Sequence, residues 1–228
     1  MKNLQNALTL KQLYQLKQIG YKYTNLCSIK VQKSIRPKRI STPITDINRV
    51  EYLIDDALNC SLCQLSKTRS RVVFGGGNTD ADIMFISDAP TYLQENSNQL
   101  FIGRSSDMLI NMIESVLFIP KSQIYFTHII KCRPPDAQAI TTIQAHSCLP
   151  YLHKEIELVK PKIIVTIGTE AYRYLTGDSA KIEDVRGTII KKDGYKIIPI
   201  FHIKYLLRNP SAKKYTFKDM KLVKSLIP

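Results

Sequence analysis

Residues 81–89, ADIMFISDA, place a run of large apolar side chains directly before the carboxylate of Asp88. Similar apolar runs recur at three further places, QIYFTHIIKC (123–132), PKIIVTIGT (161–169) and GYKIIPIFH (194–202). Apolar residues at helical spacing fill the intervals and the C-terminal part, at about 105–117, 141–159, 169–176 and 211–226. Strands rich in Ile and Val that alternate with helices indicate a sheet covered on both faces. We therefore predict an α/β fold of three layers, α/β/α, with a central, mainly parallel four-stranded sheet.

The N-terminal part of the chain has a different composition. Residues 3–19 carry leucines at helical spacing, and the basic, proline-containing stretch KSIRPKRISTPIT follows them. Helical spacing resumes at about residues 48–60. We expect a basic N-terminal helix and linker at residues 1–47 and one folded domain at residues 48–228.

The charge of the chain is strongly positive. Thirty-three Lys and Arg residues against nineteen Asp and Glu residues give a formal charge of +14. Residues 1–50 hold ten of the basic residues against Asp46 alone, and so supply +9 of that total. Such an excess suits a polyanionic partner such as nucleic acid. The alternative is a solvated basic extension without a partner.

The overall composition is that of a soluble globular protein, with 44% hydrophobic and 23% charged residues. No apolar run reaches the roughly 18 residues that a bilayer span needs, and the N-terminus has no signal-type apolar core. We expect a monomeric, cytoplasmic protein that makes no membrane contact. In that compartment, clustered cysteines bind metal more often than they form disulfides.

Four of the five cysteines form two spaced pairs. Cys60 and Cys63 stand in the stretch CSLC, and Cys132 and Cys148 follow the second apolar run, with Cys27 left over. Four thiolates can hold tetrahedral zinc or an iron-sulfur cluster, and spacing alone does not choose between them. The alternative reading of Cys132 and Cys148 is that they are ordinary buried cysteines.

Ligands of parallel sheets bind beyond the carboxyl ends of the strands. The segments that follow the four predicted strands are SDAPTYLQE, KCRPPDAQ, GTEAY and HIKYLLRNP, and each carries polar or cationic residues. We expect the functional site at this edge of the sheet. The glycines of FGGGN at residues 74–78 lack the spacing of a phosphate-binding loop and are interpreted as a turn.

From about residue 57 to 222 the chain resembles the family 4 uracil-DNA glycosylases, the iron-sulfur branch of the uracil-DNA glycosylase superfamily. The resemblance is carried, in the family's order and spacing, by CSLCQLSKTRSRVVFGGGNTDADIMFI, FIGRSSDMLINMI, KCRPP, CLPYLHKEIELVKPKIIVTIGTEA, VRG and HIKYLLRNPSAKK. It implies a DNA repair enzyme that flips uracil, or a related deaminated base, out of single- or double-stranded DNA and hydrolyses its N-glycosidic bond.

The resemblance also implies roles for individual residues. It implies a 4Fe-4S cluster as cofactor, held as a structural clip by Cys60, Cys63, Cys132 and Cys148. Asp88 and His202 match the catalytic carboxylate and histidine, and the base contacts match Ala89, Phe101 and His128. The implied DNA contacts are Arg104, Lys131, Arg133, Tyr205, Leu206 and Arg208.

The chain departs from the family pattern at several of these positions. The first motif, usually Gly-Glu-Ala-Pro-Gly, is Ser87-Asp88-Ala89-Pro90-Thr91, and the amide that reads the uracil edge is replaced by His128. His-Pro in the last motif becomes His202-Ile203, and the Asn-Arg after RPP becomes Ala137-Gln138. Two functions remain open: a glycosylase of altered rate or base preference, and a degraded relative that binds DNA without excision. Taken singly, His128 can also be interpreted as a core histidine and Asp88 as a helix or turn cap.

Overall fold

The computed structural model describes residues 46–97, 99–135 and 138–227. The predicted helix at residues 3–19, the linker up to residue 45, Cys27 and Ala137 lie outside the described residues. Within the described part, no helix combines the length and apolarity that a bilayer span requires.

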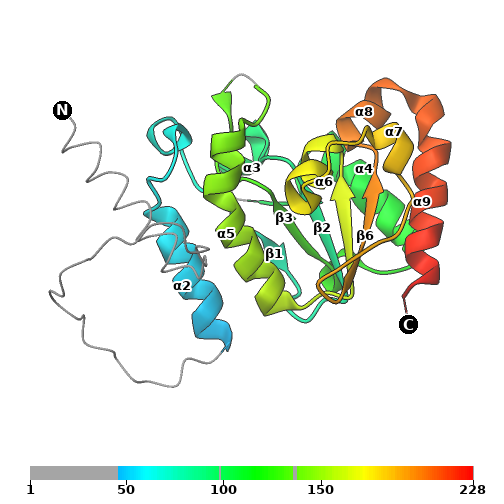
Figure 1. Cartoon of the computed structure of the whole chain (residues 1–228), viewed down its shortest axis with the longest axis horizontal. Helices are drawn as coiled ribbons and strands as arrows, with labels where there is room; N and C mark the ends of the chain where they lie inside the picture. Colours follow the sequence, from blue (N-terminus) through cyan, green and yellow to red (C-terminus); the bar gives the residue numbers. More distant parts are fainter. Residues whose placement is uncertain (1–45, 98, 136–137, 228) are drawn as a thin grey trace, which may run out of the picture.

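A six-stranded sheet forms the centre of the molecule, in the order β1-β3-β2-β4-β6-β5 (Figure 1). The four predicted strands are its middle: β2 (Ile83–Ser87), β3 (Tyr125–His128), β4 (Ile163–Ile167) and β6 (Tyr195–Ile200). All neighbours among these four are parallel. The predicted fold class is thereby confirmed.

The predicted number of strands is wrong, because the sheet has two further strands at its edges. β1 (Gly76–Gly77) pairs antiparallel with β3, and β5 (Ile190–Lys192) pairs antiparallel with β6. These strands are two and three residues long and are only partly buried. Since Gly-Gly and Ile-Lys-Lys present no apolar run, neither segment gave a strand signal.

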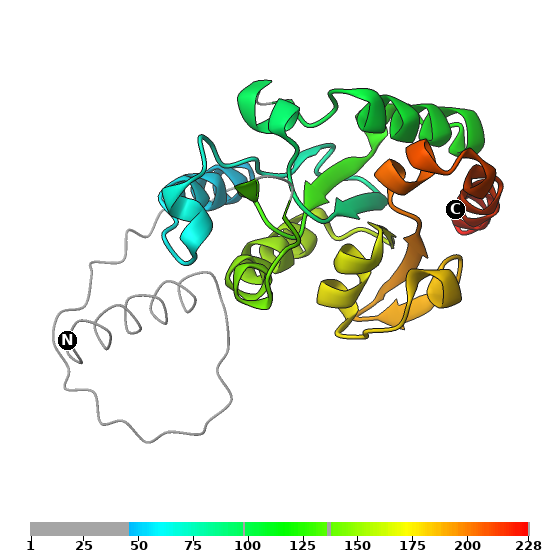
Figure 2. The same cartoon turned by 90° about the horizontal axis from the view of Figure 1, so that it is seen from above.

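Helices cover both faces of the sheet (Figure 2). One face packs against α5 (Thr142–Val159) and α6 (Thr169–Thr176), and α2 (Asp46–Leu58) packs against α5. The other packs against α4 (Arg104–Met112), its π-helical continuation (Ile113–Leu117), α7 (Ile182–Val185), α8 (Ile203–Arg208) and α9 (Lys213–Ser225). Within β2, Met84 and Ile86 contact the first layer and Ile83 and Phe85 the second, which is the alternation of a doubly covered strand.

The long helices fall where the apolar spacing predicts them, and three short ones do not. α3 (Tyr92–Ser97), α7 and α8 span four to six residues, too few for a helical period to register in the sequence. Two of them, α3 and α8, follow the strands β2 and β6 directly, so the missed helices lie where the functional site was expected.

Candidate active site

A pocket opens beyond the carboxyl ends of β2, β3 and β6. The loop after β2 supplies Asp88 to its lining, the end of β3 supplies His128, and the start of α8 supplies His202 and Lys204. Its other lining residues are Ser87, Ala89, Thr91, Gln94, Ser105, Ser106, Leu109, Phe126, Ile167 and Ile203. Three predicted site residues from separate parts of the chain therefore meet in one place.

Asp88 and His202 face each other across this pocket, with 3.2 Å between Asp88 Oδ1 and His202 Nε2. Lys204 N donates to His202 Nδ1 at 3.1 Å, because His202 caps the N-terminus of α8. Since Nδ1 accepts a hydrogen bond, Nε2 carries the proton of the neutral ring and donates it to the carboxylate. Both side chains remain about one-quarter exposed, so a ligand can reach them.

The carboxyl group of Asp88 is held in its ionised form. Burial by itself would raise its pKa, but the hydrogen bond from His202, with the further groups beside the carboxylate, outweighs burial and holds the pKa well below its usual range. Ala89 N donates to the same oxygen at 2.8 Å and Ser87 Oγ at 3.0 Å, and the charge of Lys204 acts in the same direction. A carboxylate in this state can stabilise positive charge or accept a proton.

Gly168, directly after β4, makes room for the His202 ring. Its φ is +89°, and a Cβ built there would lie 2.9 Å from both Cβ and Cδ2 of His202. A side chain at position 168 would therefore be strained and would push against the imidazole. In the sequence GTEAY follows a predicted strand, but nothing in its composition sets Gly168 apart.

His128 is enclosed at the base of the pocket. The residue is 1% exposed, its ring meets Phe126 edge-on at 5.0 Å, and its Nδ1 has no hydrogen-bond partner among the described residues. Burial lowers the pKa of His128 to about 3, and the charge of Lys131 contributes in the same direction. A neutral ring with an unpaired buried nitrogen is a site for one hydrogen bond from a ligand.

Phe101 and Ala89 occupy different places relative to the pocket. Ala89 lines it, whereas Phe101 is half-buried beside Phe126, with 5.5 Å between the ring centroids, and does not line it. Phe126, which the sequence reading left unassigned, is the aromatic ring that forms part of the wall.

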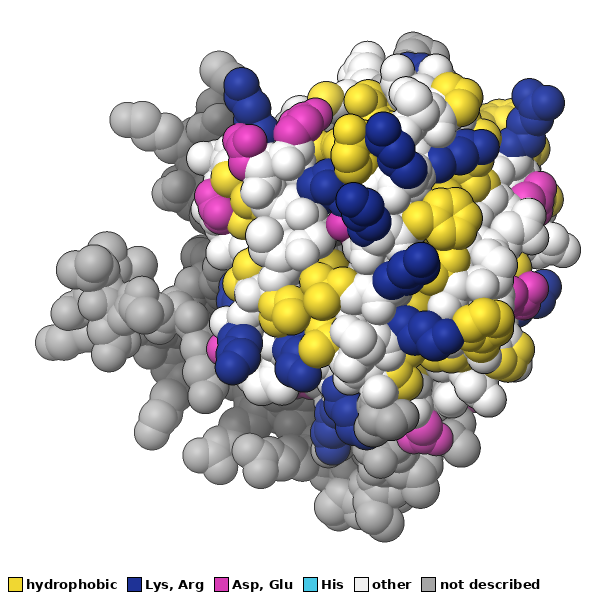
Figure 3. Space-filling view, turned by 90° about the vertical axis from the view of Figure 1, so that its right-hand side faces the viewer, with side chains coloured by type: hydrophobic (Ala, Val, Ile, Leu, Met, Phe, Trp, Pro, Cys, Tyr) yellow, Lys and Arg dark blue, Asp and Glu magenta, His cyan; other side chains and the backbone are white. Residues whose placement is uncertain are grey.

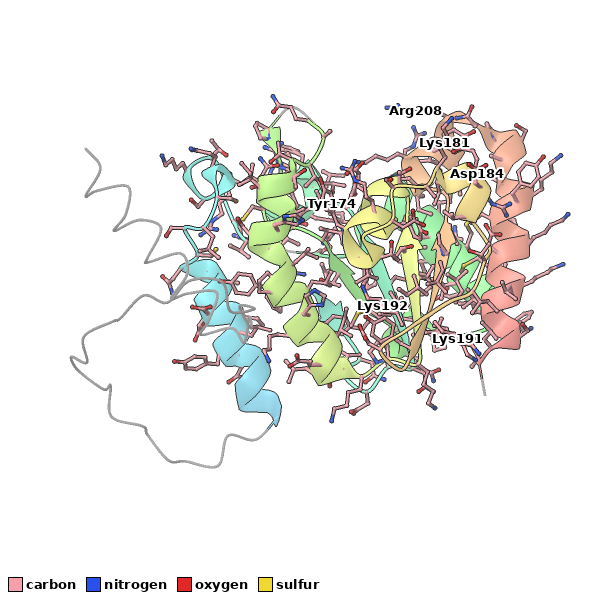
Figure 4. The ribbon with its side chains drawn as sticks, viewed as in Figure 1. Tyr174, Lys181, Asp184, Lys191, Lys192 and Arg208 are labelled. Atoms are coloured by element: carbon pink, nitrogen blue, oxygen red, sulfur yellow. The ribbon has the colours of Figure 1, made fainter. Side chains whose placement is uncertain are left out.

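The residues expected to contact DNA divide into exposed and buried groups. Arg104, Tyr205 and Arg208 are exposed, and Figure 4 shows Arg208 on the side of the molecule where α8 lies, away from Lys191 at the opposite edge. Arg133 is partly exposed, pairs with the buried Glu95 at 2.6 Å and lies over the exposed Tyr92 ring at 5.5 Å.

Lys131 and Leu206 do not suit the DNA contacts expected of them. Leu206 is 0% exposed, while its neighbour Leu207 is 39% exposed, since α8 turns the two side chains to different sides. Lys131 is 1% exposed, and its Nζ donates to Thr127 Oγ1 at 2.6 Å, His128 O at 2.8 Å and Glu155 Oε2 at 2.5 Å. Its ammonium is therefore fully used inside the protein, where it joins β3 to α5.

The four described cysteines line one cavity between α2, the turn after it, the loop after β3 and α5. Each is a free thiol. Two N–H groups donate to the sulfurs, Arg69 Nη1 to Cys132 Sγ at 3.3 Å and Lys131 N to Cys148 Sγ at 3.4 Å. Burial raises the pKa of Cys63, Cys132 and Cys148. Among the described residues, no group of three or more His, Cys, Asp or Glu side chains is arranged to hold a metal ion.

Several residues of these two sites carried no signal in the sequence. Arg69 and Glu155 are charged residues of ordinary surface type, and only the fold brings them beside a cysteine and a buried lysine. Lys204 is close to His202 in the sequence, but its contact is made by the backbone N–H, which the residue type does not reveal. Ser105 and Ser106 lie in FIGRSSDMLINMI, but no chemistry set them apart from the remainder of that stretch.

Comparison of the sequence with known proteins assigns the chain to a class. Residues 74–222 match the model of the uracil DNA glycosylase superfamily, and the chain belongs to that superfamily. More narrowly, it belongs to the type-4 uracil-DNA glycosylases. It is 31% identical to the type-4 uracil-DNA glycosylase of Saccharolobus solfataricus over 79% of this chain and 88% of the relative. The corresponding enzyme of Thermotoga maritima is 31% identical over 78% of this chain and 94% of the relative. That of Sulfurisphaera tokodaii is 29% identical over 79% and 86%.

Proposed function

We propose that this protein is a DNA repair glycosylase that hydrolyses the N-glycosidic bond of uracil in DNA. The observation that carries the proposal is the pairing of Asp88 with His202 in a pocket beyond the carboxyl ends of the strands. The family membership of the chain supports the same activity. The alternative, a relative that binds DNA without excision, is less favoured, because an inactive pocket has no need of an ionised carboxylate and an oriented imidazole.

The reaction breaks the bond between N1 of uracil and C1′ of deoxyribose, and water supplies the oxygen that replaces the base. Positive charge develops on the sugar and negative charge on the departing uracil. Asp88, ionised and partly exposed, stabilises the sugar charge and orients the water. His202 Nε2–H, which bonds to Asp88 in the free protein, is shared with the uracil anion as negative charge develops on the base.

A base that is stacked inside a duplex cannot enter this pocket, so the nucleotide must flip out. Flipping costs a few kcal/mol, and the cost is lower for a mispaired uracil. His128 then lies at the base edge with one nitrogen to offer. An amide presents a donor and an acceptor side by side, whereas a ring nitrogen presents one of them at a time. We infer weaker discrimination between uracil and cytosine than an amide would give.

We further propose that Cys60, Cys63, Cys132 and Cys148 hold a 4Fe-4S cluster. The fit rests on four free thiols around one cavity, with N–H donors at two of the sulfurs, as iron-sulfur sites commonly have. Each iron of such a cluster binds its own cysteine, so the ligands surround a cavity rather than converge on one ion. The bound cluster would cross-link α2 and the turn after it to α5 and the loop after β3. Its role would therefore be structural.

For DNA binding we propose Arg104, Arg133 and Arg208 as phosphate contacts, and Tyr205 with Leu207 as the side chains that enter the base stack. Leu207 takes the place expected of Leu206 because it is exposed and Leu206 is not. A monomeric state and a cytoplasmic location remain predictions from composition.

The test is excision from oligonucleotides that contain uracil, hypoxanthine or xanthine, followed by alkaline cleavage at the abasic sites. We expect cleavage of the uracil strand, and the loss of this cleavage in Asp88→Asn. Retained DNA binding with no excision of any of the three bases would replace the proposal by the non-catalytic alternative.

A further inference from the structure

The exposed face of α9 is a cationic surface that the pocket does not use. Within α9, all of whose residues are described, the one acid is Asp219, which is buried and paired with Arg186. The lysines of this helix are Lys213, Lys214, Lys218, Lys221 and Lys224. Figure 3, which views this side of the molecule, shows Lys and Arg side chains interspersed with hydrophobic ones. The helix therefore presents positive charge to solvent along its length of about 20 Å.

Aromatic rings lie exposed among these lysines. Tyr215 is 42% exposed and Phe217 is 39% exposed. Neither ring is part of the buried core beneath the helix. Phe217 stands four residues from Lys213 and four from Lys221, so the three share one side of the helix. Positive charge that alternates with exposed aromatic rings is the arrangement that binds single-stranded nucleic acid, because it serves phosphates and bases together.

A groove runs between α9 and the helices α4 and α8. Lys213 and Phe217 form its α9 wall, Arg104 and Met108 lie on α4, and Leu207 lies on α8. The remaining lining residues are Asp107, Asn111, Met112 and Ser115. The groove thus combines cationic, aromatic and apolar groups, with Asp107 as the carboxylate of its lining.

The groove and the base pocket share the same two helices. Ser105 and Ser106 of α4 and Lys204 of α8 line the pocket, while neighbouring residues of α4 and α8 line the groove. Since α4 and α8 pack together and residues of both line the pocket and the groove, the two are neighbours on the molecule.

We propose that this groove and the adjoining face of α9 bind the single-stranded DNA that flanks the excised base. Lys213 and Lys221 contact phosphates, and Phe217 stacks on an unpaired base. A duplex keeps its bases stacked and would leave Phe217 without a partner, so the exposed ring favours a single strand. The inference rests on the proposed function, in that it extends the DNA footprint of the same pocket.

The test measures affinity for a single strand of about 25 nucleotides that contains no uracil, over a series of salt concentrations. Lys213→Gln with Lys221→Gln should lower the slope of log affinity against log salt by about 1.4, since each phosphate contact on a single strand contributes about 0.7. Phe217→Ala should weaken binding roughly tenfold. The matched control is Lys160→Gln with Lys191→Gln, which removes two exposed charges that belong neither to the groove nor to α9 and should leave the slope unchanged.

An unchanged slope in the α9 variant, with the same unfolding midpoint as the natural protein, overturns the proposal. An equal loss of affinity for a duplex, with Phe217→Ala without effect, also overturns it and assigns the face to the duplex backbone. Excision of uracil is measured separately. If the natural protein excises uracil but the α9 variant keeps the salt slope of the natural protein, this inference alone is refuted. If the natural protein excises nothing, the proposed function alone is refuted.

Discussion

His202 Nε2 donates to Asp88 Oδ1 across 3.2 Å, between residues that lie 114 positions apart in the chain. The donor is fixed by Lys204 N, which bonds to the other ring nitrogen, and the acceptor is fixed by Ala89 N. Each partner is thus oriented by a backbone N–H group next to it, and the pair is set in place before any substrate arrives. Preorganised groups of this kind lose little energy to rearrangement during the reaction.

We expect Asp88→Asn to lower the rate of uracil excision about 10²- to 10³-fold, because the amide keeps the shape of the side chain but removes the charge that opposes the sugar cation. His202→Gln should cause a loss of similar size. The double variant should be little worse than either single variant, since the two residues act together. Single-turnover excision measures the rates, and salt-dependent DNA binding should stay unchanged in all three. Additive losses would show that the residues act independently.

Gly168→Ala should lower the excision rate about 100-fold, because the new Cβ would push the His202 ring away from its position against Asp88. Left-handed backbone also costs about 1 kcal/mol or more of stability when alanine replaces glycine. Gly194→Ala is the matched control: its φ is +90°, and a Cβ there meets nothing within 4 Å. It should lose comparable stability and keep its activity. Equal activity in the two variants would mean that His202 tolerates the displacement.

The central strands could be predicted because each is a run of apolar residues buried on both faces, as the fully buried β2 illustrates. The edge strands β1 and β5 could not, because pairing with a neighbour rather than their own composition creates them. Asp88, His128 and His202 could be assigned to one site by the rule that parallel strands present their carboxyl ends at one edge.

The fate of Lys131 could not be predicted in the same way. A lysine that follows a strand at the ligand edge is expected to face solvent. Its burial depends on Glu155, 24 residues further along the chain on α5, which accepts a hydrogen bond from the ammonium group in the interior. Leu206 and Leu207 pose a similar problem, because only the phase of the short helix α8 decides which leucine is exposed.

The purified protein should be brown and contain about four irons per chain, with a broad absorbance in the visible range, if the cysteines hold the proposed cluster. Cys132→Ser should lose iron and unfold at a lower temperature, because α5 and the loop after β3 are no longer joined through the cluster. Cys27→Ser is the control and should retain iron. Stoichiometric zinc without iron after anaerobic purification would replace the cluster by a zinc site.

The stability of the protein should fall as the pH drops below 6.5, partly because of His128. Its pKa is about 3 in the folded protein and about 6.5 when unfolded, so the unfolded chain binds the extra proton between these values. This difference removes about 2 kcal/mol of unfolding free energy at pH 5 relative to pH 8. His128→Asn should lose less stability over the same interval, by about that amount. Denaturant unfolding at both pH values measures the unfolding free energy of each protein. If both proteins lost the same stability between pH 8 and pH 5, His128 would be more solvated than the structure indicates.

The altered pocket gives the final prediction, on the double replacement Asp88→Glu with His128→Asn. The amide would restore a paired donor and acceptor for the uracil edge where the structure leaves one unpaired nitrogen. The longer carboxylate would reach farther into the pocket from the loop after β2. We expect faster excision of uracil and stronger discrimination against cytosine than in the natural protein. The ratio of kcat/KM for the two bases measures the discrimination. The salt dependence of binding should not change, because neither residue contacts a phosphate in this site.

The single variant His128→Asn separates the two effects and should change discrimination more than rate. If the natural protein excises uracil faster than the double variant, then Asp88 and the surrounding Ser87 and Ala89 donors form a geometry that the longer side chain disrupts.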